Sequence, residues 1–326
     1  MDAYARRQHL AKGPRIVAIG GGTGLSTLLR GIKQYTSNIT AIVTVTDDGG
    51  SSGGLVTEMG IQPPGDIRNC LVALADAEKR MTDLFQHRFK KSSGVFSGHS
   101  IGNVLIAGFY EQTGDLDAAL HMASDVLAIR GRVLPSTKAH VKLRALMVDD
   151  TEISGETAIV ESNKRIRRVY LDPDDVEAHP EALEAIADAD LICIGPGSVF
   201  TSVIPNLLVP GMAKAVRESR ALRVYVCNVM TQPGESDSFT AAEHLMAIEA
   251  NVDGRICDYV LVNDHSPSDE AMVRYREFDQ DLVEPDLERL GQMGYRTVTG
   301  DYMSDSDYVR HDPARLASAL IDLLYR

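Results

Sequence analysis

Short apolar runs alternate with helical patterns along most of the chain. Runs rich in Ile and Val predict buried parallel strands, and leucines spaced three or four residues apart predict helices. The predicted strands are 15–20, 39–46, 190–195, 223–229 and 258–264, with a last one near 295–302. The predicted helices are 25–35, 67–78, 82–89, 98–110, 115–127, 241–250 and 313–325, with an acidic helical stretch ending near 290. This alternation predicts a Rossmann-like three-layer α/β sandwich with a mostly parallel sheet.

The pattern changes between about Arg132 and Pro173. In HVKLRALM the apolar residues alternate with His140, Lys142 and Arg144, which is typical of a half-exposed strand. Residues 167–171 show a similar pattern. We therefore expect a small antiparallel β insertion at 132–173, serving as a lid or a dimer arm, within one nucleotide-binding domain that spans 14–326. Residues 1–13 are expected to be flexible.

Composition and charge exclude several classes of protein. The 326 residues are 44% hydrophobic and 24% charged, which is globular and not disordered. The formal charge of −13 argues against a general nucleic-acid binder, although it permits a local phosphate pocket. No Cys-x-x-Cys pair occurs, so a zinc knuckle is not expected. No apolar stretch is long enough to span a membrane, and the expectation is a soluble, cytoplasmic protein.

The loop after the first predicted strand is rich in glycine. It consists of Gly20, Gly21, Gly22, Thr23, Gly24 and Leu25. One glycine would serve a tight turn, whereas four allow a close approach of the backbone and point N–H groups at an anion. The segment matches neither the Walker A motif nor Gly-x-Gly-x-x-Gly. We therefore interpret it as a phosphate-binding loop, with an NAD site as a weak alternative.

Polar residues also follow the other predicted strands, at the sheet edge where ligands bind in such folds. Asp47 and Asp48 precede the run GGSSGG, which we expect to be a loop. These carboxylates suit Mg²⁺ binding through water or general-base chemistry. The further candidates for the nucleotide site are Gly195, Gly197, Ser198, Asn228 and Asn263.

A histidine stands at the start of a predicted apolar helix. His99 lies in SGHSIGN, and Asn103 falls one turn later on the same helix face. An imidazole in this place suits acid–base chemistry or hydrogen bonding to a phosphate, or it simply caps the helix. We include both residues among the nucleotide-binding candidates.

Several of these segments together resemble one family. They are GGGTGLSTLLRGIK, AIVTVTDDGGSSGGL, PPGDIRNCLVALAD, LFQHRF, GHSIGN, IGPGSVFTSVIPNLLVPG and CNVMTQPGES. They resemble the YvcK-type gluconeogenesis factors, which belong to the superfamily of the phospholactate transferase CofD. The resemblance extends from about Pro14 to the C-terminus and implies a Rossmann-like fold whose glycine-rich loops form a nucleotide pocket.

The resemblance also implies a ligand. Gluconeogenesis factors of this type bind UDP-sugars, notably UDP-N-acetylglucosamine, and support cell shape and envelope synthesis during gluconeogenic growth. The residues that match the family's UDP-sugar site are the loop 20–25, Tyr275 and Arg310, and its aspartate pair matches Asp47 and Asp48. Some relatives carry a phosphorylatable Thr where this chain has Pro313, so the sequence leaves open whether phosphorylation regulates it.

Three classes of function follow from these observations. We favour a non-catalytic regulator that binds a UDP-sugar, with the amides of 21–24 and of Gly197 and Ser198 on the phosphates. In that arrangement Asn228 and Asn263 contact the sugar or the base. The alternative is a CofD-like transferase, which moves a phospholactyl group from a GDP carrier to a deazaflavin with Mg²⁺ at Asp47 and Asp48. An NAD(P) oxidoreductase is the least favoured of the three hypotheses. Whether the protein forms homo-oligomers or binds envelope-synthesis proteins stays open.

Overall fold

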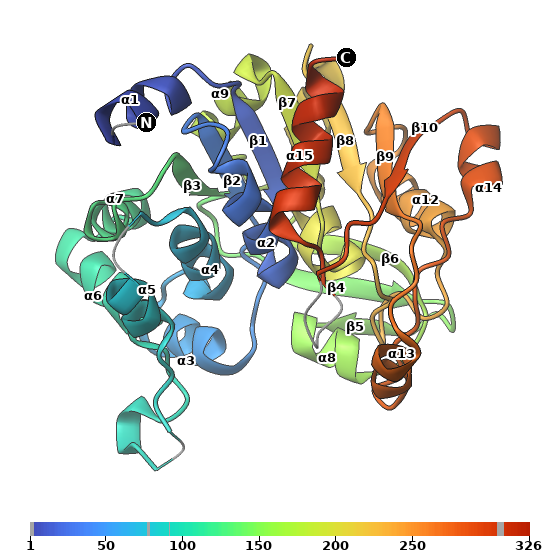
Figure 1. Cartoon of the computed structure of the whole chain (residues 1–326). Helices are drawn as coiled ribbons and strands as arrows, with labels where there is room; N and C mark the ends of the chain where they lie inside the picture. Colours follow the sequence, from blue (N-terminus) through green and yellow to red (C-terminus); the bar gives the residue numbers. More distant parts are fainter. Residues whose placement is uncertain (1–2, 77–78, 91, 305–309) are drawn as a thin grey trace.

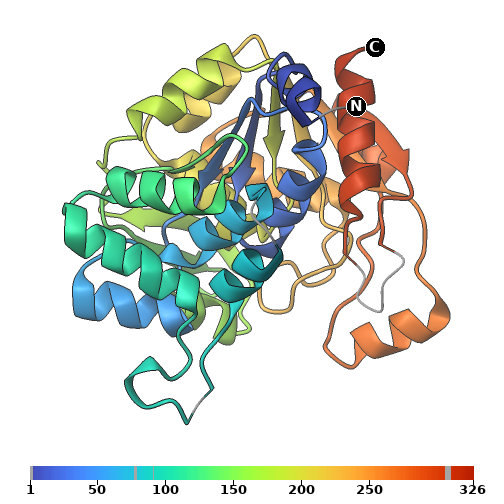
Figure 2. The same cartoon turned by 60° about the vertical axis from the view of Figure 1, so that its left-hand side comes forward.

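The computed structural model describes residues 3–76, 79–90, 92–304 and 310–326. A seven-stranded sheet forms its centre, with strand order β10-β9-β8-β7-β1-β2-β3. Every neighbouring pair is parallel, and helices cover both faces of the sheet (Figures 1 and 2). The strands are β1 Ile16–Gly20, β2 Ile39–Val43, β3 Arg132–Pro135, β7 Leu191–Ile194, β8 Leu222–Val226, β9 Tyr259–Asn263 and β10 Arg296–Gly300. The predicted three-layer α/β fold is confirmed.

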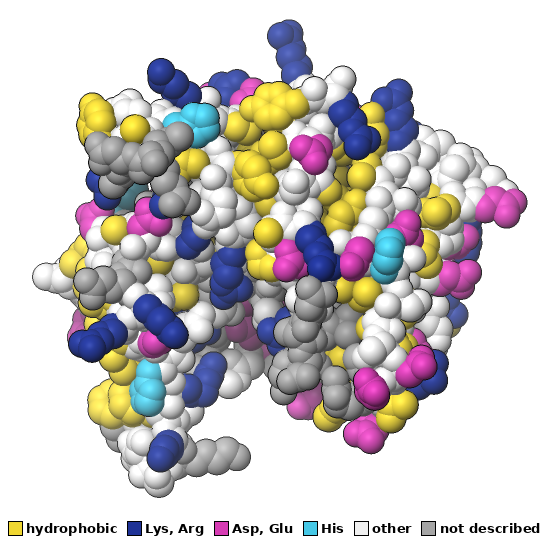
Figure 3. Space-filling view, in the orientation of Figure 1, with side chains coloured by type: hydrophobic (Ala, Val, Ile, Leu, Met, Phe, Trp, Pro, Cys, Tyr) yellow, Lys and Arg dark blue, Asp and Glu magenta, His cyan; other side chains and the backbone are white. Residues whose placement is uncertain are grey.

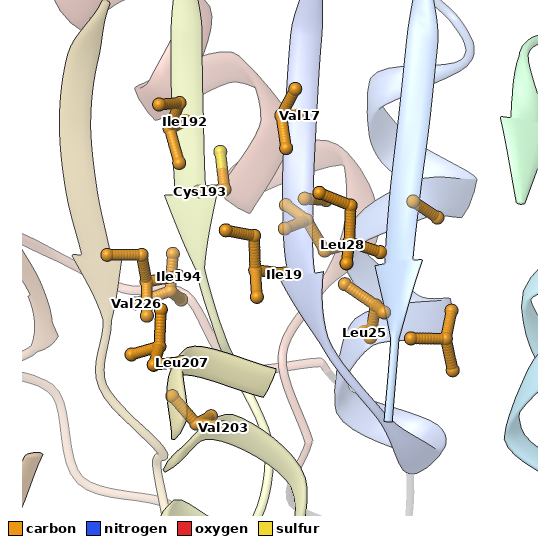
Figure 4. Close-up of a cluster of buried hydrophobic side chains, with 14 of the residues drawn as sticks. Val17, Ile19, Leu25, Leu28, Ile192, Cys193, Ile194, Val203, Leu207 and Val226 are labelled. Atoms are coloured by element: carbon orange, nitrogen blue, oxygen red, sulfur yellow. The ribbon is translucent and has the colours of Figure 1, made fainter. Parts of the chain in front are cut away.

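The central strands are apolar along their whole length because helices bury both faces. All five residues of β1 and of β2 are buried, as are all four of β7. Figure 4 shows Leu25 and Leu28 of α2 (Gly22–Ile32) beside β1, and Ile194 of β7 beside Val226 and Leu207. Complete burial of such side chains is worth roughly 2 kcal/mol each, so this layer supplies a rigid base for the loops at the strand ends.

The remaining helices connect the strands and form the two outer layers. They are α1 Ala3–Leu10, α3 Gly50–Met59, α4 Pro64–Leu74, α5 Lys79–Gln86, α6 Ile101–Thr113, α7 Leu116–Leu127, α8 Glu156–Glu161, α9 Pro180–Asp188, α10 Ile204–Leu208, α11 Met212–Glu218, α12 Ala241–Val252, α13 Asp269–Arg276, α14 Leu287–Gln292 and α15 Pro313–Leu324. In the described ranges no single helix is long and apolar enough to cross a membrane. The bent pair 199–208 and 212–218 has the length and composition of a broken span, and its residues Val199 to Leu207 are buried in the core.

A second, antiparallel sheet forms the insertion, as predicted, but its boundary differs. Strands β4 (Lys142–Met147), β5 (Glu152–Ser154) and β6 (Ile166–Asp172) pair in the order β5-β4-β6. The insertion was expected to begin at about 132, but residues 132–135 pair in parallel with β2 as the edge of the main sheet. This strand has four residues and ends in Pro135, so it carries almost no apolar pattern.

Two further segments differ from the expectation. The Gly/Ser run after Asp48 is not a loop, because α3 begins at Gly50 and contains GSSGG as its first turns. The N-terminal segment, expected to be flexible, forms α1, and the Leu10 side chain is buried. The Asn38 side-chain amide donates to the carbonyls of Ala11 and Gly13, which fastens this segment to the main sheet.

Residues 87–90 and 92–99 extend away from the body between α5 and α6 (Figures 1 and 2). Phe89 and His99 are paired through the His99 carbonyl, and the ring centroids of Phe89 and Phe96 are 5.3 Å apart. Figure 3 shows basic side chains over this corner of the molecule and acidic ones around α13 at the opposite corner. The charges are therefore unevenly distributed on this face.

Candidate ligand-binding site

A cavity of about 1050 Å³ opens at the carboxyl ends of β1, β2, β7 and β8, at the lower end of the sheet in Figure 1. This is the edge at which ligands bind in parallel α/β sheets. The residues that line it are Gly21, Gly22, Thr23, Gly24, Thr27, Asp47, Asp66, Glu156, Pro196, Gly197, Ser198, Ser202, Asn228, Val229, Met230, Thr231, Gln232, Tyr275, Phe278, Gln280, Arg310 and His311.

The glycine-rich loop turns directly from β1 into α2. Gly21 is extended, with φ −167°, and Gly22 has φ +62°, a conformation that favours glycine. A Cβ on Gly24 would lie 2.6 Å from the Pro196 carbonyl oxygen. The N-terminus of α2 therefore packs against the loop 195–198, and both loops present backbone to the same cavity.

The loop 195–198 is held by side chains from the next strand end. The Asn228 amide accepts a hydrogen bond from the Gly197 N–H (3.0 Å) and donates to the Gly197 carbonyl (2.9 Å). The buried Glu235 carboxylate accepts hydrogen bonds from the hydroxyls of Thr201 and Ser198, and burial raises its pKa. Asn228 and Ser198 thus shape the cavity wall through contacts within the protein.

Three carboxylates gather on one side of the cavity. They belong to Asp47, Asp66 at the start of α4, and Glu156 at the start of α8. Desolvation raises the pKa of Asp66 to about 6, opposed by the Gly22 backbone N–H and reinforced by the charge of Asp47. Desolvation also raises the pKa of Glu156 well above its usual range, with the charges of Asp47, Asp66 and Glu235 adding to it.

Another part of the cavity lining is aromatic and basic. Tyr275 of α13 packs against the apolar cluster of Val229, Met230 and Met303. Phe278 lies two residues beyond α13 with 70% of its surface exposed, so its ring is accessible to a ligand. Arg310 comes from the segment before α15 and lies within reach of the same space. The aromatic rings of Tyr275 and Phe278 can stack on a planar ring system, and the guanidinium of Arg310 can bind an anion.

Ten of the predicted site residues line this cavity. They are Gly21, Gly22, Thr23, Gly24, Asp47, Gly197, Ser198, Asn228, Tyr275 and Arg310. Tyr275 and Arg310 are more than 200 residues from the glycine loop in sequence, and the fold brings them to it. Seven others lie outside the lining: Gly20, Leu25, Asp48, His99, Asn103, Gly195 and Asn263.

Those seven have structural contacts elsewhere. The Gly20 carbonyl accepts from the Thr44 N–H, the Leu25 side chain is fully buried, and Gly195 has φ +78° beside Val226. Asp48 accepts hydrogen bonds from Thr157. The Asn263 amide bonds to the His265 carbonyl and the Tyr302 N–H.

His99 and Asn103 belong to a separate polar cluster beneath α3. The Ser51 hydroxyl lies 3.1 Å from His99 Nδ1 and accepts a hydrogen bond from the Asn103 amide at 3.1 Å. Arg68 donates to the Ser100 hydroxyl and to Asn103 Oδ1. These hydrogen bonds connect α3 to α4 and α6. His99 and Asn103 therefore hold α3, which follows Asp47 and Asp48, in place.

Several lining residues were missed from the sequence. The predicted site residues do not include Asp66, at the start of α4, or Glu156, within the insertion. Phe278, Gln280 and Gln232 stand in irregular segments without a motif. The one available signal is the PPGD sequence, which ends in Asp66. An acidic residue in the first turn of a helix is favoured by the partial positive charge of the helix N-terminus.

In the part of the chain that the structure describes, no group of three or more His, Cys, Asp or Glu has the geometry of a metal site. Asp47 and Asp48 point to different partners: the Asp47 carboxylate accepts from the Gly49 N–H, and that of Asp48 accepts from Thr157. The two carboxylates therefore face different partners in this structure, and Mg²⁺ binding by the pair stays a prediction.

His311 makes the stability of the fold depend on pH. Its side chain is buried beside the cavity, and Nε2 donates to the Cys227 carbonyl at 3.1 Å. Desolvation lowers its pKa from 6.5 to about 4. The folded state therefore holds His311 neutral. The stabilisation that this gives is fully present above pH 6.5. As the pH falls toward 4, the free energy of unfolding decreases by up to about 3 kcal/mol.

We expect the free energy of unfolding in urea to fall more steeply between pH 6.5 and 4.5 for the wild type than for His311→Gln. The control is His121→Gln on the exposed face of α7, which should follow the wild-type profile. Parallel profiles for wild type and His311→Gln would show that His311 does not cause the acid sensitivity.

Comparison with known proteins agrees with this architecture. Residues 16–303 match the family model described as 2-phospho-L-lactate transferase CofD. A solved structure from Bacillus halodurans, described as a member of the upf0052 family, superposes with a TM-score of 0.91 at 46% identity. It covers 94% of this chain and 99% of that one. The chain therefore belongs to the CofD family.

Within the family, the chain is similar to proteins named gluconeogenesis factors. One from Bacillus subtilis (strain 168) is 47% identical over 95% of this chain and 98% of its own length. Another from Halalkalibacterium halodurans is 46% identical over 95% of this chain and 97% of its own. The resemblance stated from the sequence motifs is confirmed over essentially the whole chain.

Proposed function

We propose that this chain is a nucleotide-sugar-binding gluconeogenesis factor, a regulator that binds UDP-N-acetylglucosamine and supports cell shape and envelope synthesis during gluconeogenic growth. One observation carries the proposal: a single cavity joins the glycine-rich N-terminus of α2 to Arg310 and to the aromatic rings of Tyr275 and Phe278. A cavity of about 1050 Å³ is at the upper end of the range for small-molecule sites. It accommodates a base, a diphosphate and a sugar together.

The chemistry of the lining assigns an orientation to such a ligand. Backbone amides at the start of α2 and the guanidinium of Arg310 suit the diphosphate, because both donate to phosphate oxygens. The amides act with the partial positive charge of a helix N-terminus and the guanidinium with a full charge. The rings of Tyr275 and Phe278 offer a surface on which a uracil can stack. The sugar then extends toward the side of the cavity that Asp47, Asp66 and Glu156 line.

Mg²⁺ is the cofactor that the transferase branch implies. Asp47 and Asp66 offer the carboxylate oxygens that this ion prefers. Desolvation is the main cause of the raised pKa of Asp66, and the charge of Asp47 adds to it. Two carboxylates leave the remaining positions to phosphate oxygens and water, which is the usual way in which proteins bind Mg²⁺. A bound ion would neutralise the charge between these side chains and a diphosphate.

The carboxylates also support a second candidate function, a CofD-like transferase. Asp66, with a pKa raised to about 6, is suited to accept a proton near neutral pH. In this case the cavity would take a GDP-linked phospholactyl group and a deazaflavin acceptor. A shift of the deazaflavin absorption on addition of protein would favour the transferase, and an unchanged spectrum would favour the regulator.

Arg310→Ala tests the proposed function at one side chain. We expect the Kd for UDP-N-acetylglucosamine to rise roughly 10- to 100-fold, because hydrogen bonds to charged groups contribute about 1.5–3 kcal/mol. The matched control is Arg276→Ala, which removes the same charge from an exposed position on α13. Calorimetric titration measures both, and wild-type affinity in Arg310→Ala would count against the proposed site.

A further inference from the structure

The insertion contributes a side chain to the cavity. Glu156 is the first residue of α8, yet it lines the same space as the glycine loop of the main sheet. Among the described residues its carboxylate has one hydrogen bond, in which Oε2 accepts from the Thr46 hydroxyl at 3.3 Å. A carboxylate offers about four acceptor positions. The others are left for donors that enter the cavity.

A contact from the main domain fixes the position of α8. The helix has Gly155 as its N-cap and no cap from its own side chains. Asp48 replaces that cap: its Oδ1 accepts from the Thr157 N–H at 2.9 Å and from the Thr157 hydroxyl at 2.8 Å. A Cβ on Gly155 would lie 2.5 Å from Asp48 Oδ2, so the approach leaves room only for glycine.

Groups that attract an anion and groups that repel one lie next to each other in the cavity, because the Asp66 carboxylate accepts a hydrogen bond from the Gly22 N–H at the start of α2. The α2 amides and Arg310 attract an anion, whereas Asp47, Asp66 and Glu156 together repel one. The raised pKa of Glu156, caused by desolvation and by neighbouring negative charges, reflects that repulsion. Neutral groups that donate hydrogen bonds, such as hydroxyls and an amide N–H, satisfy carboxylates without adding negative charge.

We propose that Glu156 is a specificity-determining residue, which accepts hydrogen bonds from the hydroxyl- and amide-bearing group carried by the nucleoside diphosphate. Asp48 is then a positioning residue, which acts through Thr157 to place Glu156 at the cavity wall. The insertion thereby distinguishes a nucleotide-sugar from the bare nucleotide. This inference rests on the proposed function, because it assumes that the diphosphate occupies the α2 side of the cavity.

The test compares two ligands, UDP and UDP-N-acetylglucosamine, by calorimetry. In Glu156→Ala we expect the affinity for UDP-N-acetylglucosamine to fall about tenfold while the affinity for UDP stays within twofold, since a hydrogen bond to the Glu156 carboxyl group is lost. The matched control is Glu161→Ala, which removes the same side chain from the exposed end of α8. It should leave both affinities unchanged.

Asp48 is tested by a pair of variants that separates positioning from charge. Asp48→Ala removes the acceptor for Thr157, and we expect the preference for UDP-N-acetylglucosamine over UDP to fall about threefold. Asp48→Asn retains an acceptor oxygen and should restore the preference. Failure of the Asn variant to restore it would show that Asp48 acts through its charge, which would overturn its role as a positioning residue.

The outcomes also separate this inference from the proposed function. An equal loss of both affinities in Glu156→Ala, or no change in either, overturns the inference while the UDP-sugar site stands. If the wild-type protein binds neither ligand, the proposed function and the inference fail together. A selective loss of the sugar-bearing ligand in Glu156→Ala, with an unaffected Glu161→Ala, supports both.

Discussion

Gly24→Ala is expected to abolish tight binding of UDP-N-acetylglucosamine, with a loss of affinity of about 100-fold. The added Cβ would lie 2.6 Å from the Pro196 carbonyl oxygen and 3.0 Å from the Gly197 nitrogen. Both atoms belong to backbone, so the loop 195–198 or the N-terminus of α2 must move. A displacement of about 1 Å is enough to misalign the amides that are expected to hold the diphosphate.

Gly108→Ala provides the control for this prediction. Gly108 lies inside α6, and a Cβ there would meet nothing within 4 Å. The same substitution should therefore leave ligand binding unchanged and stabilise the helix by up to about 1 kcal/mol. Calorimetric titration of both variants gives the comparison, and a Gly24→Ala protein with wild-type affinity would show that close packing of the two loops is not needed.

Gly31→Ala is expected to reduce the free energy of unfolding by about 3 kcal/mol. Gly31 lies where α2 meets α15, and an added Cβ would lie 1.9 Å from the Pro313 carbonyl oxygen and 2.8 Å from the Ala317 Cβ. The clash falls on backbone, so the two helices must separate. This separation would open the core against Leu28 and Ile32, which are fully buried.

Urea unfolding followed by circular dichroism measures this loss. The control is Gly291→Ala in α14, where a Cβ would have nothing within 4 Å, and its unfolding midpoint should equal or exceed that of the wild type. Because Gly31 lies more than one turn beyond the glycine loop, a Gly31→Ala protein should still bind ligand while it remains folded. An unchanged midpoint for Gly31→Ala would contradict the close crossing of α2 and α15.

The strand core was predictable because parallel strands buried on both faces are apolar along their whole length. The runs at β1, β2, β7, β8 and β9 carry this signal clearly. The edge strand β3 does not, since it has four residues and ends in Pro135. The first turns of α3 also escaped prediction, because glycine and serine disfavour helices. Contacts such as Ser51 with His99 and Asn103 support the helix there.

The site was predictable to the extent that it lies at strand ends. The loop 21–24, Asp47 and the loop 197–198 follow buried strands, and topology alone brings them to one edge. Tyr275 and Arg310 were assigned only through the resemblance to a family. For Asp66 the PPGD sequence is the one available signal. Glu156 has none, since an insertion approaches the cavity from a direction that sequence spacing does not encode.

The measurement that tests the central claim most directly is calorimetric titration of the wild-type protein with UDP-N-acetylglucosamine, GDP and NAD, each with and without Mg²⁺. We expect micromolar binding of the UDP-sugar, weak or no binding of the other two, and no consumption of the ligand during the titration. A Mg²⁺-dependent preference for GDP would contradict the proposed regulator. It would favour the transferase and make Asp47 and Asp66 the first residues to substitute.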